Sequence, residues 1–145
     1  MKKITSIITI LLGLSVLPLT AAEGNAAFQQ NLQLAKTGDA KSQVYVALRY
    51  DQGRDGVEKN QEEALKWFLA AAKQGNTTGQ AIAGARLQVK KGDDLIEAYK
   101  WLSLASDAGH ANSKKALSNV TRKLKPAQLA EAKKRAAEFK PSSGK

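Results

Sequence analysis

The chain has 145 residues, no cysteine, one histidine and a formal net charge of +10. This length suits a single domain, and without cysteine neither disulfides nor thiolate zinc sites can form. One histidine, with no serine in a strand-to-helix elbow, leaves no catalytic triad to assemble. We therefore expect a protein that is not an enzyme, with no catalytic residues, no cofactor and no metal.

Residues 1–22 have the pattern of a secretory signal peptide. Lys2 and Lys3 give a basic start, residues 4–17 are apolar, and small residues lead to Ala22. Fourteen apolar residues cover about 21 Å of a bilayer core of roughly 30 Å. Cleavage after Ala22 is therefore favoured over a retained anchor, with no membrane span left afterwards. The sequence predicts an exported, periplasmic protein.

The positive charge of the remaining chain lies in its last quarter. Residues 23–109 hold 11 basic and 11 acidic side chains, whereas residues 110–145 hold 10 basic and two acidic ones. Such asymmetry favours contact with anionic lipid, polysaccharide or acidic protein; a merely solvated surface is the alternative. Nucleic acid is disfavoured because the chain is exported and the basic residues lack interleaved aromatics. The candidate contact residues are Lys114, Lys115, Arg122, Lys123, Lys133 and Lys134.

Hydrophobic periodicity predicts helices along the rest of the chain. A helical domain is expected to span residues 23–139, with residues 23–26 irregular at its start, followed by a disordered tail at residues 140–145. Asp39 and Asn76 are expected to cap helices, and Asn60 with Glu63, and Asp94 with Glu97, fit capping boxes. The predicted helices cover residues 27–36, 40–52, about 61–74, 78–91, 94–108, 111–124 and 127–139.

A repeat organises the centre of the chain. Residues 63–75 recur 34 residues later as residues 97–109, a period typical of stacked two-helix units. Trp67 and Trp101 occupy the same place in the two copies and lie within an apolar stripe. They are therefore predicted to pack in the core rather than to stack on a ligand.

In these residues the chain resembles the Sel-1-like repeats, a branch of the tetratricopeptide type of helical repeat. The resemblance spans residues 35–139, although Ala47 replaces the usual glycine and Arg54-Asp55 lengthens the first turn by one residue. The resemblance implies an all-α fold, a short right-handed solenoid of two full helix pairs with an N-terminal helix and C-terminal capping helices. It also implies a scaffold or adaptor for proteins in the bacterial envelope. The first unit carries the pattern at Gly38, Ala40, Gln43, Tyr50, Gly53, Gly56, Val57, Ala64, Trp67, Phe68, Ala71, Ala72 and Gly75.

The first helix of each pair lines the concave side in solenoids of this type, so its free face is the candidate binding surface for a protein partner. Arg49 and Arg86 are expected to lie in register along this groove of a monomeric protein. Alternatively, the apolar residues among the candidates pack on adjacent helices, or the chain only stabilises a larger complex. His110 is expected to be a surface residue at a helix start. The candidate groove residues are Tyr45, Leu48, Arg49, Gln52, Ile82 and Arg86.

Overall fold

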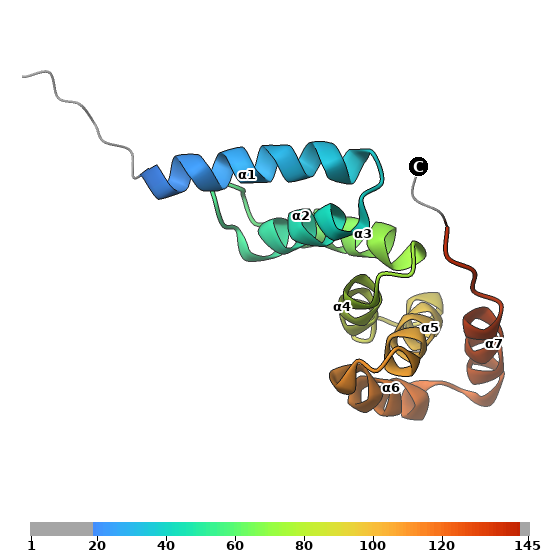
Figure 1. Ribbon diagram of the computed structural model, residues 1–145. Helices are drawn as coiled ribbons and strands as arrows, with labels where there is room; N and C mark the ends of the chain where they lie inside the picture. Colours follow the sequence, from blue (N-terminus) through green and yellow to red (C-terminus); the bar gives the residue numbers. More distant parts are fainter. Residues whose placement is uncertain (1–18, 143–145) are drawn as a thin grey trace, which may run out of the picture.

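The computed structural model describes residues 19–142, and this part of the chain consists of α-helices without a strand (Figure 1). Each helix packs against the next up to α6, which confirms the predicted all-α solenoid. The seven helices are α1 (Leu19–Lys36), α2 (Ala40–Gln52), α3 (Gln61–Lys73), α4 (Thr77–Leu87), α5 (Asp93–Asp107), α6 (Ala111–Lys123) and α7 (Pro126–Ala137).

The helix α1 begins earlier than the sequence predicts. It already includes residues 23–26, so the irregular segment expected there is wrong. Most of the predicted signal peptide, residues 1–18, lies outside the described residues. Among the described helices, none combines the length and apolar character needed to cross a bilayer.

The first helix of each pair starts with a polar N-cap side chain. Asp39 and Asn76 precede α2 and α4, and each side chain accepts a hydrogen bond from the backbone N–H three residues on, at 2.6 and 2.9 Å. His110 takes this place ahead of α6, with its ring Nδ1 2.9 Å from the Ser113 hydroxyl. Both predicted caps and the helix-start position of His110 are confirmed.

Buried glutamines join each pair to the helix before it. Gln43 of α2 donates its amide to the Ala35 carbonyl at 3.1 Å, and Gln80 of α4 donates to the Ala72 carbonyl at 3.3 Å. Both side chains are buried, so the bonds give their amide groups partners inside the protein, on carbonyls that also accept the N–H groups of Gly38 and Gly75. Because the same bond recurs, the two units stack with the same geometry.

Small residues bring neighbouring helices together. A Cβ on Gly79 would lie 2.9 Å from the Phe68 carbonyl oxygen, and one on Gly84 would lie 2.7 Å from Leu102 Cγ. Helix α4 can therefore approach α3 and α5 closely only because it carries glycine at these points. The largest fully buried side chains, Trp101, Phe68 and Leu102, fill the space between the pairs.

The start of the second helix in each pair differs from the prediction. Asn60 caps α3, as expected, but its own N–H donates to the Tyr50 carbonyl at 2.8 Å, while Glu63 pairs with Lys66. Before α5 the cap position is held by Gly92, whose φ of 64° is accessible to glycine. The expected cap by Asp94 is therefore wrong, and α4 ends at Leu87 instead of residue 91.

The last helix closes the solenoid by packing on α5 more extensively than on α6, so the two C-terminal helices do not repeat the earlier pairs. Arg135 of α7 binds Asp93 at 2.9 Å, Glu97 at 3.0 Å and Glu131 at 2.8 Å. The hydrogen bonds that Arg135 donates to these carboxylates, the one to Asp93 first, raise its pKa. Glu131 lies on α7 itself, four residues before Arg135, and the other two carboxylates come from α5, so Arg135 ties the last helix to α5.

After α7 the chain runs back toward the end of α3 (Figure 1). Phe139 meets the Trp101 ring edge-on, with ring centroids 5.3 Å apart. Ser142 donates its backbone N–H and its hydroxyl to the Lys73 carbonyl, at 2.9 and 3.1 Å. Residues 140–142 of the tail expected to be disordered are thus extended and hydrogen-bonded at their end, and residues 143–145 lie outside the described residues.

Candidate partner-binding groove

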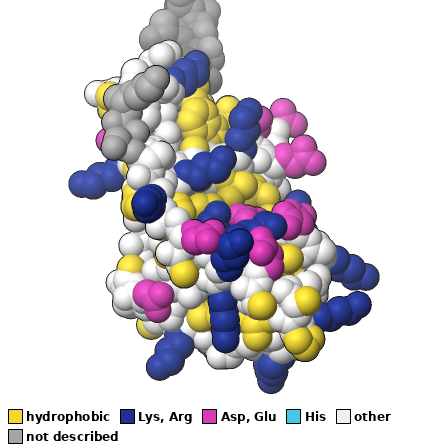
Figure 2. Space-filling view, turned by 90° about the vertical axis from the view of Figure 1, so that its right-hand side faces the viewer, with side chains coloured by type: hydrophobic (Ala, Val, Ile, Leu, Met, Phe, Trp, Pro, Cys, Tyr) yellow, Lys and Arg dark blue, Asp and Glu magenta, His cyan; other side chains and the backbone are white. Residues whose placement is uncertain are grey.

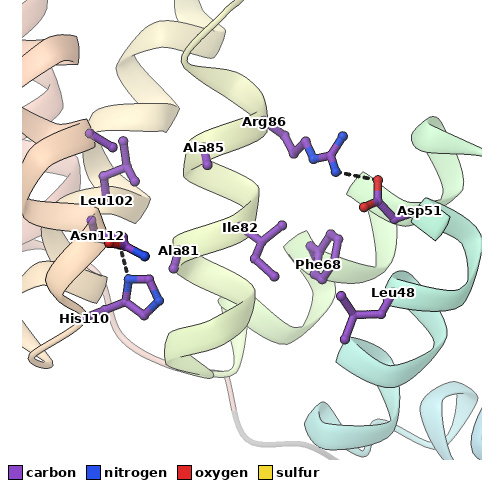
Figure 3. Close-up of a pocket in the computed structure, with 12 residues that line it drawn as sticks. Leu48, Asp51, Phe68, Ala81, Ile82, Ala85, Arg86, Leu102, His110 and Asn112 are labelled. Carbon is purple, nitrogen blue, oxygen red and sulfur yellow. Dashed lines mark hydrogen bonds and ion pairs between the residues drawn. The ribbon is translucent and has the colours of Figure 1, made fainter.

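A hollow of about 370 Å³ opens along the first helices of the units, with α4 as its floor and α2 and α6 as its walls (Figure 3). Leu48, Ile82 and Phe68 gather on one side of α4, and His110 lies on the other. Most of the lining is apolar, and small side chains on α4 leave the space open. The lining residues are Leu48, Asp51, Phe68, Ala81, Ile82, Ala85, Arg86, Leu102, His110, Asn112, Ser113 and Ala116.

An ion pair crosses the groove at one end. Arg86 of α4 donates to an Asp51 carboxylate oxygen on α2 at 2.5 Å, which links the first helices of the two units. The Arg86 side chain is 38% exposed, while that of Asp51 is only 18% exposed. Arg86 therefore presents guanidinium N–H groups to a partner, since the fork has five donors and one carboxylate does not use them all.

The structure brings together three of the six predicted groove residues, namely Leu48, Ile82 and Arg86. Arg49 points elsewhere: it pairs with Asp55, and its guanidinium lies 4.2 Å from the centre of the Tyr45 ring. Tyr45 in turn packs on the cluster around Phe28 of α1. The expectation that Arg49 and Arg86 lie in register along one groove is therefore wrong.

The cause is the lengthened first turn. Asp55, in the Arg54-Asp55 pair that lengthens this turn by one residue, has a φ of 58° and directs its carboxylate to Arg49. The shorter turn of the second unit has no such contact with Arg86, which reaches Asp51 instead. Gln52 is exposed at the C-terminal end of α2 and does not line the hollow.

Sequence reasoning missed several lining residues. Asp51 follows Leu48 by three positions and so shares its helix face, a signal that could have identified it. Phe68 and Leu102 belong to second helices, and these buried side chains border the hollow beside the small residues of α4. Within residues 19–142, no group of three His, Asp or Glu side chains is arranged to hold a metal ion.

The six predicted basic contacts lie on α6 and α7, all of them exposed. Within residues 19–142 none of them forms an ion pair; Arg122 hydrogen-bonds Asn119, and Lys123 reaches the Gln88 carbonyl at 3.2 Å. Viewed from the side of α7, acidic and basic side chains mix at mid-height, whereas the lower part carries several Lys and Arg side chains and few acids (Figure 2). Lys133 stands apart, beside a small hollow between α5 and α7.

Two consecutive helix pairs with matching caps, glutamine bonds and a shared groove define a helical-repeat protein. The family model of the Sel1 repeat matches residues 40–76 and 84–110, one match in each pair, so the chain carries Sel1 repeats. Repeats of this family generally mediate protein–protein interaction and are typically non-catalytic. The comparison with curated proteins gave no match.

A solved structure shares the fold. It is the crystal structure of a protective antigen present in uropathogenic Escherichia coli strains and displaying an SLR fold, with a TM-score of 0.71 and 23% sequence identity. The alignment covers 81% of this chain and 26% of the antigen, so this chain spans about a quarter of that protein's length. At this identity the likeness supports the fold alone.

Proposed function

We propose that this protein is a non-catalytic adaptor of the bacterial cell envelope, exported by its N-terminal leader, that captures a segment of a partner protein in the groove over α4. The observation that carries the proposal is the apolar hollow between α2, α4 and α6, with Arg86 and Asp51 at one end. Apolar anchors flanked by a few polar groups are what protein segments need for specific docking.

The groove has features of a surface built for contact rather than for packing. Leu48 and Ile82 pack against the cluster around Phe68 but stay only partly buried, and Ala85 is exposed, so part of their apolar surface is left facing the hollow. Arg is enriched in interface hot spots because its planar fork binds several acceptors at once. The ion pair with Asp51 holds the Arg86 side chain in place before a partner arrives.

The test is affinity capture from an envelope extract with Ala85→Trp as the blocking variant. The new indole enters the hollow from an exposed position, so the helical circular dichroism spectrum should not change while capture is lost. Ala130→Trp, at an exposed site on α7, is the matched control and should capture as the parent does. Equal capture by both variants would refute the groove as the binding site, and fractionation of cells tests the envelope location.

A second candidate is binding to an anionic envelope surface through the basic helices. It is favoured by α6, which has four basic and no acidic residues, and whose large apolar residues Leu117 and Val120 pack against the core. Attachment would then be electrostatic, without insertion. Sedimentation with anionic vesicles should fall steeply between low and physiological salt, and Lys114→Glu with Lys115→Glu should remove it. Salt-independent sedimentation would contradict this candidate.

A further inference from the structure

A second hollow lies between α5 and α7, apart from the groove over α4. It has a volume of about 220 Å³ and shares no lining residue with the groove. Helix α5 contributes one wall and α7 the other, since these two helices pack side by side (Figure 1). A ligand of this hollow would therefore be independent of the function proposed for the groove.

The two walls of this hollow carry charges of opposite sign. Asp107 is the last residue of α5, and Lys133 lies on α7. Both residues are exposed, and neither forms an ion pair or a side-chain hydrogen bond within residues 19–142. An exposed pair between these two side chains would contribute little to stability, so a ligand that binds between them displaces little.

The hollow also borders a buried phenol. Tyr99 is 9% exposed, and its ring belongs to the core cluster around Trp101. Its hydroxyl has no hydrogen-bond partner within residues 19–142, although the hydroxyl of a buried tyrosine usually has one. Burial, and then the negative charge of Asp107, raise the pKa of Tyr99, so the phenol remains protonated. A fixed hydroxyl group is thus available as a donor beside the two charges.

Size limits what the hollow can hold. Its volume is roughly seven times the volume of a water molecule in the liquid, so it suits a ligand with a similar number of non-hydrogen atoms. Ala136 and Ala137 of α7 leave this space open because their side chains are small. A peptide of several residues exceeds this volume, which leaves small molecules.

We propose that the hollow between α5 and α7 binds a small zwitterion of the ω-amino acid class, with its ammonium group toward Asp107 and its carboxylate toward Lys133 and the Tyr99 hydroxyl. An ion of one sign would be attracted by one wall and repelled by the other, whereas a zwitterion pairs with both. Because Asp107 ends α5, the negative end of the helix dipole also favours the ammonium there. Tyr99 and Asp107 stand two turns apart on α5, so the two charges of the ligand should be several bonds apart.

The test titrates the purified, isotope-labelled protein with four probes at equal ionic strength and follows the amide shifts of α5 and α7 by NMR. The probe 4-aminobutyrate has both charges, butylamine and butyrate each lack one of them, and glycine holds both on adjacent atoms. Butylamine and butyrate should each bind about fivefold more weakly than 4-aminobutyrate, the most that one exposed ion pair contributes. Glycine should also bind more weakly, because it cannot reach both walls.

Variants assign each charge to its partner. In Lys133→Gln, 4-aminobutyrate should bind about as weakly as butylamine, and in Asp107→Asn about as weakly as butyrate. Tyr99→Phe keeps the ring in the core and should weaken butyrate and 4-aminobutyrate without affecting butylamine. Lys134→Gln is the matched control, because it removes the same charge from an exposed neighbouring site that does not line the hollow. It should bind all four probes as the parent protein does.

Each contrary result has a distinct meaning. If butylamine or butyrate binds the parent protein as tightly as 4-aminobutyrate, the hollow takes an ion of one sign and the zwitterion is refuted. If glycine binds as tightly, the separation of the two charges is refuted. Equal effects of Lys133→Gln and Lys134→Gln, or no shifts around the hollow at millimolar probe, would overturn the proposal. None of these results bears on the groove, which is tested by capture of a protein partner.

Discussion

The two Sel1 repeats place their shared tryptophan in the same position of the second helix but bury it to different extents. Trp101 is 1% exposed, while Trp67 is only partly buried. The difference comes from outside the repeats, because Phe139 covers Trp101 edge-on, with ring centroids 5.3 Å apart. The motif thus directs the ring inward, and the neighbouring segments decide how deeply it is buried.

The largest expected effect separates these tryptophans. Trp101→Ala should lower the free energy of unfolding by about 3–5 kcal/mol, the usual loss for a fully buried aromatic ring. Trp67→Ala should cost about 2 kcal/mol, because its ring keeps part of its surface in water in the native state. Urea unfolding followed by circular dichroism measures both. Equal losses would mean that the burial difference has no energetic weight.

A fluorescence measurement sharpens the same comparison. With Trp67→Phe as the background, Trp101 is the remaining emitter. Adding Phe139→Ala should shift its emission to longer wavelength, because water reaches the indole where the covering ring was. Lys140→Ala, next to Phe139 but exposed, is the control and should leave the spectrum unchanged.

Most of the fold can be predicted from the sequence because the helices follow from hydrophobic periodicity and from the residues at their ends. Helix α2 begins and ends at the predicted residues, and the caps at Asp39 and Asn76 are local signals that need no tertiary context. The start of α1 was missed because it depends on a tertiary contact. Gly24 lies so close to the first turn that a Cβ on it would be 2.8 Å from Asp55 Cγ. A contact between residues so far apart in the chain leaves no periodic signal.

The candidate groove was half predictable for a related reason. Helical spacing places Leu48, Ile82 and Arg86 on the free face of the first helices, and the structure gathers them. The direction of the Arg49 side chain depends on its ion pair with Asp55 in the turn, and helical periodicity carries no information about turn residues. The one-residue lengthening at Arg54-Asp55 was visible as a departure from the repeat pattern, but its effect on Arg49 depends on the backbone conformation of the turn.

An effect of intermediate size on stability should come from one position in the first helix of each pair. This position holds Ala47 in the first repeat and Gly84 in the second, a difference of one methyl group. In Gly84→Ala the new Cβ would lie 2.7 Å from Leu102 Cγ and 3.1 Å from the Leu102 backbone nitrogen. Overpacking of about 1–3 kcal/mol should exceed the helix-propensity gain of about 1 kcal/mol.

We therefore expect Gly84→Ala to lower the free energy of unfolding by about 1–2 kcal/mol. Ala47→Gly should also destabilise, by about 1 kcal/mol, because glycine is a poor helix former. Both substitutions make the repeats more alike in sequence, yet both should lower the urea midpoint. A raised midpoint for Gly84→Ala would show that α4 and α5 can separate at no cost.

The smallest expected effect concerns the caps, where the first unit has the titratable Asp39 and the second has the neutral Asn76. Hydrogen bonds from the Ser42 hydroxyl and backbone N–H lower the pKa of Asp39 below its ordinary value. The charged form is thus favoured in the folded state, so its stabilisation is complete above the unfolded-state pKa of about 3.9 and is lost as the pH falls through the folded-state pKa.

The substitution Asp39→Asn keeps a good cap but removes this titration. At pH 7 the variant should be slightly less stable than the parent, since the charge near the helix N-terminus is gone. At a pH low enough to protonate the parent's carboxyl group in the folded state, this deficit should vanish or reverse. Urea unfolding of both proteins at the two pH values measures the change, with Asn76→Asp as the converse variant that should gain a pH-dependent term. A deficit that is the same at both pH values would mean that the two caps act through geometry alone.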